Sequence, residues 1–357
     1  MSVSTHQAPA AVRIAVAGAG LIGRRHIEEI QAYAGTELCG IADPSPQAAD
    51  LAAALGVPVH RSVPELLAEQ RPDGVVVATP NLCHHADAVA VIDAGIPVLV
   101  EKPLAVTVTE AADLVTRAEA AGVALLTGHH RTHSAVMAAA REVIASGRLG
   151  RLVAVQGNAC FHKPDAYFDV GDGWRRRPGG GPIQLNLIHD VDNLRQLLGP
   201  ITEVQASVAN AARGFAVEDT AAVLLRFANG ALGTFLLSDV AASARSWEQT
   251  AGENLSYERH QDEDAYVVMG TRGSLAIPTM RLKFFPGEAS WTEPLRTEQL
   301  QVAARDPLAA QISHFAAVIR GAEKPLCDGR AGLAAVAVVT AILTASRTGS
   351  TVPVHIP

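Results

Sequence analysis

The 357-residue sequence predicts an α/β protein whose first domain is built on a doubly wound parallel sheet. Three observations support this fold class. Short β-branched runs alternate with helical segments over the first third of the chain, which is the rhythm of βαβ units. A glycine-rich turn follows the first of these runs. Further along, strand-like runs follow one another without helices between them, which is typical of an antiparallel or mixed sheet. The chain length fits about two domains of roughly 150 residues.

The first domain is expected to hold six parallel strands and the helices that connect them. Its strands are apolar runs at Arg13–Ala17, Leu38–Ala42, Val57–His60, Gly74–Ala78, Val98–Glu101 and Ala124–Thr127. Its helices are the segments between these runs, at Leu21–Tyr33, Pro46–Leu55, Val63–Glu69, Cys83–Ala94 and Thr109–Ala121. Because parallel strands need crossover connections, these helices are expected to cover both faces of the sheet.

The second domain is expected to begin with a helix over Ser134–Ser146. Its strands are the longer alternating runs at Leu152–Cys160, Thr202–Asn210, Ala221–Phe227, Ala231–Asp239 and Tyr266–Met269. The polar stretch Arg245–Asp264 predicts an exposed loop or a long hairpin end, and closing helices are expected at Pro307–Arg320 and Arg330–Arg347. We therefore place the domains at residues 1–130 and 131–357, and allow the closing helices to pack back on the first domain.

The composition excludes several classes of partner. The chain is 48% apolar and 18% charged, its formal net charge is −7, and no run of Lys or Arg residues is longer than three. Nucleic acid and anionic lipid both require a concentrated basic surface, so we expect neither of them and favour a small molecule. The apolar run Leu333–Ala345 is shorter than the roughly 20 residues that cross a bilayer, and it predicts a buried helix.

The N-terminus and the cysteines favour the cytoplasm. The first seven residues show no basic segment followed by an apolar stretch, so no secretory signal is expected. The four cysteines lie far apart in the sequence and form no C-x-x-C pair, so we expect reduced thiols. They are Cys39, Cys83, Cys160 and Cys327. The run Cys83-His84-His85 could suggest a metal. Because these neighbours point in different directions on a helix, we expect no metal site.

A nucleotide-binding motif follows the first strand. Gly18-Ala19-Gly20-Leu21-Ile22-Gly23 directly follows Ile14-Ala15-Val16-Ala17 and opens a helical pattern. In G-x-G-x-x-G, the glycines permit a tight turn, close approach to pyrophosphate and close packing of helix on strand. Free N–H groups at the helix start then favour phosphate. The alternative is an ordinary glycine-rich turn. Since strand, turn and helix occur in the required order, we expect Gly18, Gly20, Leu21, Ile22 and Gly23 to bind a dinucleotide.

Asp43 predicts which dinucleotide is bound. It ends the second strand, 20 residues after Gly23, where a carboxylate accepts hydrogen bonds from ribose hydroxyls and repels a 2′-phosphate. The residues that follow it, Pro44, Ser45 and Pro46, carry no positive charge. This pattern favours NAD over NADP.

The loops after the fourth and fifth strands are expected at the same carboxyl edge, where a doubly wound sheet binds its ligand. The fourth-strand loop offers Thr79, Pro80, Asn81 and then His84 for the cofactor; the alternative for Thr79 and Asn81 is helix capping. The fifth strand ends in Glu101-Lys102-Pro103, where Glu101 and Lys102 are also expected to contact the cofactor. Lys102 could polarise a hydroxyl or a carbonyl, or it could be a surface lysine paired with Glu101.

A second group of polar residues follows Trp174-Arg175-Arg176-Arg177-Pro178-Gly179-Gly180-Gly181. A helix is expected over Ile183–Leu198, with an apolar stripe on one side and a polar face formed by Asn186, His189, Asp192, Asn193 and Gln196. His189 is suited to taking a proton from an alcohol, and Asp192 could orient it. The alternative is a solvated face with a surface histidine. Arg131 is a candidate substrate or cofactor contact, while His129, His130 and His133 around it are left unassigned.

Together these motifs resemble the Gfo/Idh/MocA family, the relatives of glucose-fructose oxidoreductase and inositol 2-dehydrogenase, over almost the whole chain. The resemblance implies an N-terminal Rossmann domain and a C-terminal α/β domain with a large, mostly antiparallel open sheet, which commonly serves in a homodimer or homotetramer. It implies a nicotinamide cofactor and a sugar, cyclitol or related polyol substrate. By resemblance, Lys102 matches the family lysine that contacts substrate and nicotinamide, Lys102-Pro103 is a candidate cis peptide, and His189 matches the proton-transfer histidine.

We expect a substrate site formed by Lys102, Arg131, Trp174, Arg175, Asn186, His189 and Asp192. One position departs from the pattern. Inositol enzymes of the family often carry an aspartate four residues before the histidine, whereas this chain has Leu185 there, which leaves Asp190 or Asp192 as possible substitutes. The resulting hypothesis is NAD-dependent oxidation of a secondary alcohol to a ketone, with Lys102 and His189 as the catalytic pair. The alternatives are an enzyme that recycles bound NAD in a net non-redox step, and a non-catalytic nucleotide sensor.

Overall fold

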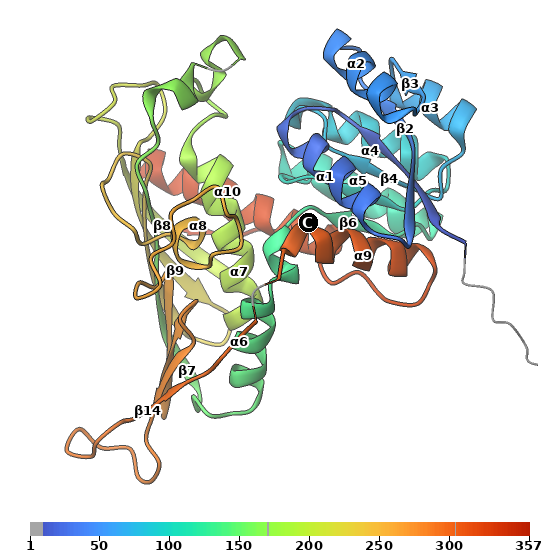
Figure 1. Cartoon of the computed structure of the whole chain (residues 1–357). Coiled ribbons are helices and arrows are strands. Elements are labelled where there is room, and N and C mark those ends of the chain that lie inside the picture. The colour runs from blue at the N-terminus through green and yellow to red at the C-terminus, as the bar shows by residue number, and fades with distance from the viewer. Residues whose placement is uncertain (1–9, 170, 304) are drawn as a thin grey trace, which may run out of the picture. The chain divides into compact units, whose positions relative to one another are not determined.

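The computed structural model describes residues 10–169, 171–303 and 305–357 (Figure 1). The chain divides into two compact units. The first consists of Met1–Gly128 together with Leu308–Gly332, and the second of His129–Pro307 together with Leu333–Pro357. A segment from near the C-terminus is therefore part of the first unit.

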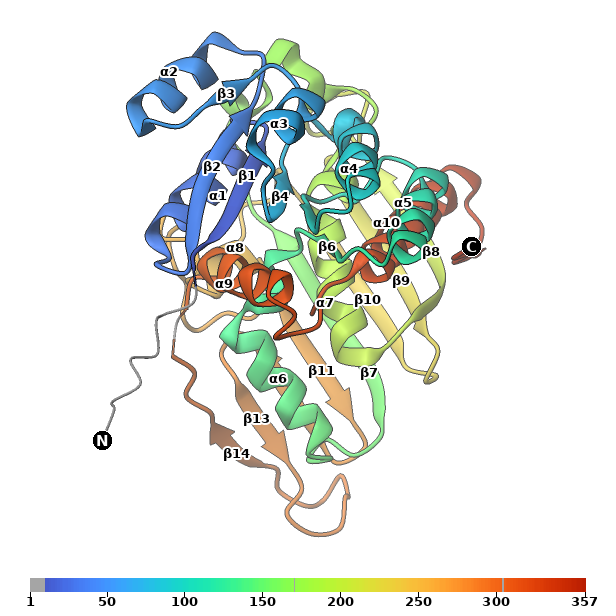
Figure 2. The same ribbon diagram turned by 90° about the vertical axis from the view of Figure 1, so that its right-hand side faces the viewer.

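The first unit contains a six-stranded parallel sheet with the order β3-β2-β1-β4-β5-β6. Its strands are β1 (Val12–Ala17), β2 (Thr36–Ala42), β3 (Val59–His60), β4 (Gly74–Val77), β5 (Val98–Val100) and β6 (Leu125–Thr127) (Figure 2). The strand order reverses between β1 and β4, which is the switch point where doubly wound sheets bind ligands. The predicted Rossmann-type sheet is confirmed.

The connecting helices begin and end at residues that suit those positions. They are α1 (Leu21–Ala32), α2 (Pro46–Leu55), α3 (Val63–Gln70), α4 (His84–Asp93) and α5 (Val108–Ala121). Ser45 and Ser62 cap α2 and α3, and Thr107 forms a capping box with Glu110 at the start of α5. Residues Asn81–Cys83, where the sequence predicted the start of α4, instead form the 3₁₀ turn η1.

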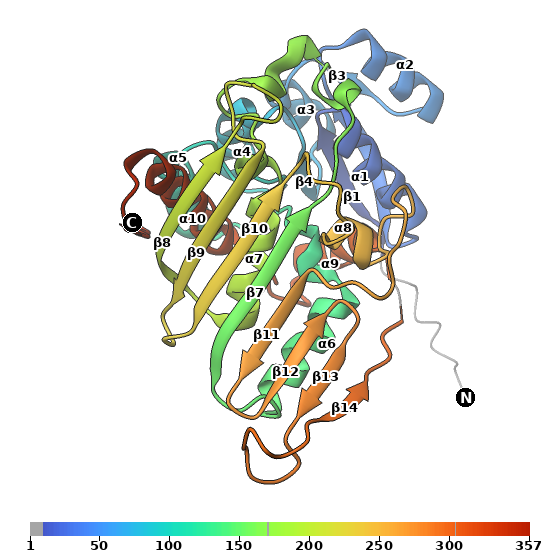
Figure 3. The same ribbon diagram turned by 90° about the vertical axis from the view of Figure 1, so that its left-hand side faces the viewer.

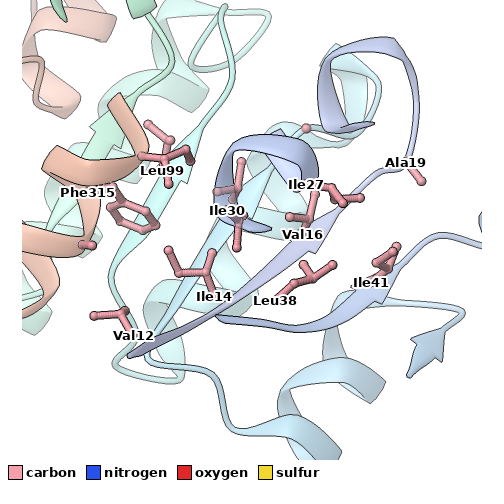
Figure 4. Packing of buried hydrophobic residues seen from close by; sticks show 14 of the residues in the cluster. Val12, Ile14, Val16, Ala19, Ile27, Ile30, Leu38, Ile41, Leu99 and Phe315 are labelled. Atoms are coloured by element: carbon pink, nitrogen blue, oxygen red, sulfur yellow. The ribbon is translucent and has the colours of Figure 1, made fainter. Parts of the chain in front are cut away.

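Helix α9 (Pro307–Ile319) contributes to the core of the first unit. Its Phe315 is fully buried in one hydrophobic cluster with Ile14 of β1 and Ile30 of α1 (Figure 4). Ile312 of the same helix is also fully buried in this cluster. At Gly74, which opens β4, a Cβ atom would lie 2.4 Å from the Ile319 side chain. The absence of a side chain at Gly74 therefore allows α9, which is distant in the sequence, to pack against β4.

The second unit contains a nine-stranded sheet with the order β14-β13-β12-β11-β7-β10-β9-β8-β15 (Figure 3). The strands are β7 (Leu152–Cys160), β8 (Ile201–Ala209), β9 (Thr220–Phe227), β10 (Leu232–Ser238), β11 (Tyr266–Gly270), β12 (Gly273–Ile277), β13 (Arg281–Phe284), β14 (Arg296–Gln299) and β15 (Val352–Pro353). Among the described strand pairs of this nine-stranded sheet, β7 and β10 alone run parallel. The mostly antiparallel sheet is thus confirmed, and it extends through β12, β13 and β14, which the sequence analysis did not assign.

Two segments of the second unit differ from expectation. The predicted helix over Ile183–Leu198 is a π-helical turn at Ile183–Leu187 followed by α7 (Ile188–Leu198). The predicted loop at Arg245–Asp264 contains the short helix α8 (Trp247–Thr250), which Ser246 caps and whose Trp247 is buried. Most residues of this segment are polar, so the sequence analysis did not recognise that Trp247 is buried. Helix α6 (Ala135–Ala145) and the 3₁₀ turns η2 (His130–His133), η3 (Asp165–Phe168) and η4 (Gly171–Arg176) are further helical elements of this unit.

Helix α10 (Gly329–Thr348) covers the apolar run near the C-terminus. With 20 residues it is long and apolar enough to cross a membrane. The helix is longer than the apolar run Leu333–Ala345, from which the sequence analysis judged its length. However, 67% of its most apolar window is buried inside the protein. The core helix of a soluble protein has the same length and composition, so α10 is weak support for a membrane span.

Candidate functional site

The glycine-rich turn between β1 and α1 has the geometry of a dinucleotide loop. Gly18 has φ +91°, and a Cβ atom there would lie 2.4 Å from the Ala78 carbonyl oxygen. A Cβ atom on Gly23 would lie 2.0 Å from the carbonyl oxygen of Gly18. At Gly20, by contrast, nothing lies within 4 Å of the added atom. Two glycines therefore permit chain packing, and Gly20 leaves open space for a ligand.

The start of α1 presents unbonded backbone N–H groups beside that open space. Gly20 is the N-cap residue, and no side chain caps the helix. Leu21 is 87% exposed, and the first turn carries no acidic residue. The free N–H groups and the helix dipole favour an anion such as pyrophosphate at this position.

Asp43 lies next to the same turn. Its Oδ2 atom accepts a hydrogen bond from the Ala19 amide at 2.8 Å, and its Oδ1 atom accepts one from the Ser45 amide at 2.8 Å. Burial acts to raise the pKa of Asp43, but the bonds from Ser45 and Ala19, together with the charge of Arg24, lower it below its usual value. Asp43 is therefore an ionised acceptor.

Arg24 was missed by the sequence analysis, which looked for positive charge only after Asp43. The residue directly follows Gly23, and its Nε atom donates to the Ala19 carbonyl oxygen at 3.1 Å. Its position directly after the glycine motif was the available signal.

The loop after β4 is held by side-chain bonds. The Thr79 hydroxyl donates to Asp87 at 2.7 Å, and the buried ring of His84 bonds to the Thr79 carbonyl oxygen at 2.9 Å. No side chain caps η1 or α4, so Thr79 and Asn81 are not capping residues. Pro80 is exposed and Asn81 is half-buried. The loop therefore follows the switch-point strand with its conformation set by Asp87 and His84.

Lys102 lies in the turn after β5. The Lys102-Pro103 peptide is cis, as the resemblance implied, and Lys102 is half-buried. Glu101 is buried; one of its oxygens bonds to His26 at 2.8 Å, and the other accepts the Lys102 backbone amide at 3.1 Å. On the other side of Lys102, the His84 ring bonds to the Pro103 carbonyl oxygen at 2.7 Å. His26 was missed because its only signal was a position three residues after Gly23.

In the second unit, the π-helical turn positions Asn186. The half-buried Glu218 carboxylate accepts the Ile183 amide at 2.9 Å, and a Cβ atom on Gly181 would lie 2.4 Å from that carboxylate. Burial raises the pKa of Glu218, although the Ile183 bond acts to lower it. Lys163, which the sequence analysis missed, donates from its buried ammonium to Asn186 at 2.6 Å. The last of the three glycines thus permits a close approach that anchors the turn.

His189 lies on α7, and it is 7% exposed. Its ring centroid lies 5.7 Å from that of His129 and 5.1 Å from that of His130. Asp192 and Asn193 of the same polar face are buried as well. The alternative of a solvated surface is therefore wrong, because Thr132 bonds to Asp192 and Tyr266 bonds to Asn193. Two histidines left unassigned lie beside His189.

Arg131 and Asp190 form the centre of a buried polar network. The Arg131 guanidinium bonds to Asp190 at 3.0 Å and also to Glu248, and the Tyr266 hydroxyl donates to Asp190. Burial opposes the charge on Arg131, but Glu248 and Asp190 together raise its pKa. Burial also raises the pKa of Asp190 to about 6, even though Arg131 acts to lower it. This network ties α7 to η2, α8 and β11.

The remaining predicted substrate residues have other partners within the second unit. Asp192 accepts bonds from Thr132 at 3.1 Å and Gln196 at 2.6 Å, which connects α7 to η2. Arg175 lies over the Tyr167 ring at 4.0 Å, and Trp174 is 38% exposed. In the described part of the chain, no group of three His, Cys, Asp or Glu residues could hold a metal ion.

Comparisons with known proteins agree with this geometry. Residues 12–129 match the model of an oxidoreductase family with an NAD-binding Rossmann fold, and residues 137–276 match the GFO/IDH/MocA C-terminal domain. The chain belongs to the GFO/IDH/MocA family of oxidoreductases. As a family member it is an NAD-binding oxidoreductase, and the open space at Gly20, the uncapped start of α1 and the ionised Asp43 fit that cofactor.

Several known proteins are similar to this chain over most of their length. A 1,5-anhydro-D-fructose reductase from Ensifer adhaerens is 31% identical over 81% of this chain and 81% of the reductase. Inositol 2-dehydrogenase 2 from Saccharopolyspora erythraea is 30% identical over 97% of this chain and 96% of the dehydrogenase. The crystal structure of the WlbA dehydrogenase from Bordetella pertussis, in complex with NADH and UDP-GlcNAcA, superposes with a TM-score of 0.77. It is 27% identical and covers 97% of this chain and 100% of that chain.

Proposed function

We propose that this protein uses NAD to oxidise a secondary alcohol of a sugar, cyclitol or related polyol to a ketone. The observation that carries the proposal is the Lys102 turn, which ends β5 at the carboxyl edge of an NAD-binding sheet. Relatives named for 1,5-anhydro-D-fructose and inositol support the substrate class. The protein also retains the two residues that a nucleotide sensor does not need, Lys102 and His189.

The chain's own residues perform the proton chemistry in this proposal. Lys102 holds the reacting oxygen and stabilises the negative charge that develops on it. His189 accepts the hydroxyl proton as the carbon loses hydride. Bound NAD supplies the hydride acceptor. Asn186, Trp174 and Arg175 contact substrate hydroxyls, whereas the buried Arg131 and Asp192 orient α7 through the bonds described above.

The test is absorbance of reduced nicotinamide when the protein is mixed with NAD, or separately with NADP, and a panel of inositols, aldoses, glycosides and sugar acids. We expect a signal with NAD and one substrate group. Product formed without any release of NADH would instead show that bound NAD is recycled. Cofactor binding without any product would favour the sensor.

Replacing Asp43 with Asn is expected to reduce the preference for NAD. The amide keeps the size of the carboxylate but loses its charge, and with it the strong ribose acceptor and the repulsion of a 2′-phosphate. Loss of a hydrogen bond to a charged group predicts about a 10- to 100-fold fall in the ratio of kcat/KM for NAD to that for NADP. Steady-state kinetics with both cofactors measure this ratio.

The matched control is Asp73→Asn. Asp73 also accepts a backbone N–H, from Arg13 at 2.8 Å, but it lies before β4 rather than after β2. An Asp43→Asn ratio no lower than that of Asp73→Asn would contradict the role of Asp43.

We also propose that the protein is a cytoplasmic homo-oligomer joined through the open face of the nine-stranded sheet. On β9 and β10, buried residues alternate with exposed ones, and the exposed set includes Leu224, Leu232 and Leu236. Two hollows of about 460 and 510 Å³ lie on this face. A second copy of the chain would cover this apolar surface, as the resemblance implies. All four cysteines are free thiols, which supports the cytoplasm.

Placing a charge on this face is expected to separate the subunits. Leu224→Glu together with Leu236→Glu would bury two carboxylates in the proposed interface, which is unfavourable without a partner charge. Light scattering coupled to size exclusion should then give the monomer mass. The control is Leu326→Glu, because Leu326 is similarly exposed but belongs to the first unit. A double variant with the same mass as the unaltered protein would place the interface elsewhere.

A further inference from the structure

Two buried histidines of the first unit bond to the residues on either side of Lys102. His26 comes from α1, the helix of the glycine motif, and bonds to Glu101. His84 comes from α4, the helix after the switch-point loop, and bonds to Pro103. We propose that His26 and His84 are positioning residues that hold the Lys102 turn to the two dinucleotide loops. The name histidine clasp is used below for these two residues.

The first half of the clasp is an unbroken chain of contacts. His26 is 0% exposed and Glu101 is 4% exposed, with 2.8 Å between Nε2 of the ring and Oε1 of the carboxylate. The other carboxylate oxygen accepts the Lys102 amide at 3.1 Å. A Cβ atom on Gly128 would lie 2.8 Å from Glu101 Oε1, so the neighbouring strand end also packs closely on this carboxylate. A shift of α1 is thereby transmitted to the backbone of Lys102.

The second half of the clasp uses both ring nitrogens of one histidine. Nδ1 of His84 lies 2.7 Å from the Pro103 carbonyl oxygen, and Nε2 lies 2.9 Å from the Thr79 carbonyl oxygen. These two contacts place one histidine ring between the residue after Lys102 and the loop after β4.

The consequence is a fixed position for Lys102 relative to the cofactor loops. The clasp holds the residue before Lys102 and the residue after it, so little freedom remains in the backbone between them. Misplacing a catalytic group by about 1 Å can cost on the order of 100-fold in rate. The expected loss of rate rests on the proposed catalytic role of Lys102, whereas the expected rigidity of the turn does not.

The experiment compares His84→Leu and His26→Leu with His85→Leu. His85 is the neighbour of His84 on α4, but it bonds to Asp113 on α5. Two readouts are taken: amide hydrogen exchange of the segment Val98–Leu104, and kcat alongside the Kd for NAD. We expect both clasp variants to exchange this segment at least about tenfold faster and to lose about 10- to 100-fold in kcat, with little change in Kd. His85→Leu should match the unaltered protein.

Conservative variants keep the test decisive if a leucine variant fails to fold. The side-chain amide of His84→Gln or His26→Gln can still donate a hydrogen bond, so these variants should recover part of the lost rate and protection. Unchanged exchange in the folded clasp variants would overturn the proposal. Faster exchange with full activity, found together with an active Lys102→Ala protein, would support the clasp and reject the catalytic role of Lys102 instead.

Discussion

Lys102→Ala is expected to lower kcat by about 10²- to 10³-fold while NAD still binds with nearly its normal Kd. In the proposed mechanism the ammonium group stabilises charge that develops on the substrate oxygen, and removing one such donor has an effect of this size in other enzymes. The dinucleotide loop, Asp43 and the helix start at Leu21 are unaltered by the change. Initial rates of NADH formation and a fluorescence titration with NAD measure the two quantities separately.

The control for this substitution is Lys283→Ala. Lys283 is an exposed lysine on β13, in the second unit. It should keep full activity. A Lys102→Ala protein with the turnover of Lys283→Ala would remove Lys102 from the chemical step, whatever its effect on substrate KM.

His189→Gln is expected to lower kcat by about 10²- to 10⁴-fold and to change the pH dependence of the reaction. A general base must be unprotonated to accept the alcohol proton, so the rate of oxidation should fall as the pH is lowered in the unaltered protein. Glutamine has no titrating group, and the acidic limb of the kcat/KM profile due to this residue should disappear. Rates measured across the pH range in the direction of alcohol oxidation test this.

His355→Gln is the matched control, because His355 is an exposed histidine near the C-terminus. The acidic limb should persist in that variant. If it also persists unchanged in His189→Gln, another group accepts the proton, and His129 and His130, which lie beside the His189 ring, would be the next residues to replace.

Local sequence determined the parts of this protein that depend on neighbours along the chain. The parallel strands could be predicted because each is a short β-branched run followed by a helical segment. The dinucleotide turn could be predicted because its glycines are required within six residues. Asp43 followed from its place at the end of the next strand. Each of these inferences needs only the backbone conformation of a single segment.

Tertiary structure decided the contacts between residues that are distant in the sequence. Nothing around Phe315 indicates that α9 completes the core beneath β1, because its apolar residues would suit any buried helix. The polar face of α7 was ambiguous for the same reason: periodicity shows that a face is polar, but only the packed unit shows that His189 is buried. Arg131 likewise has the sequence context of a substrate contact, and its pairing with Asp190 requires two folded elements.

The same division applies to the turn that carries Lys102. The motif Glu101-Lys102-Pro103 and its place after a buried strand could be read from the sequence. The bonds of Glu101 to His26 and of Pro103 to His84 could not be read from the sequence. Those partners lie on α1 and α4, which are distant from the turn along the chain. Hydrogen-bond partners are determined by position in space, and a sequence pattern specifies that position only within one strand or helix.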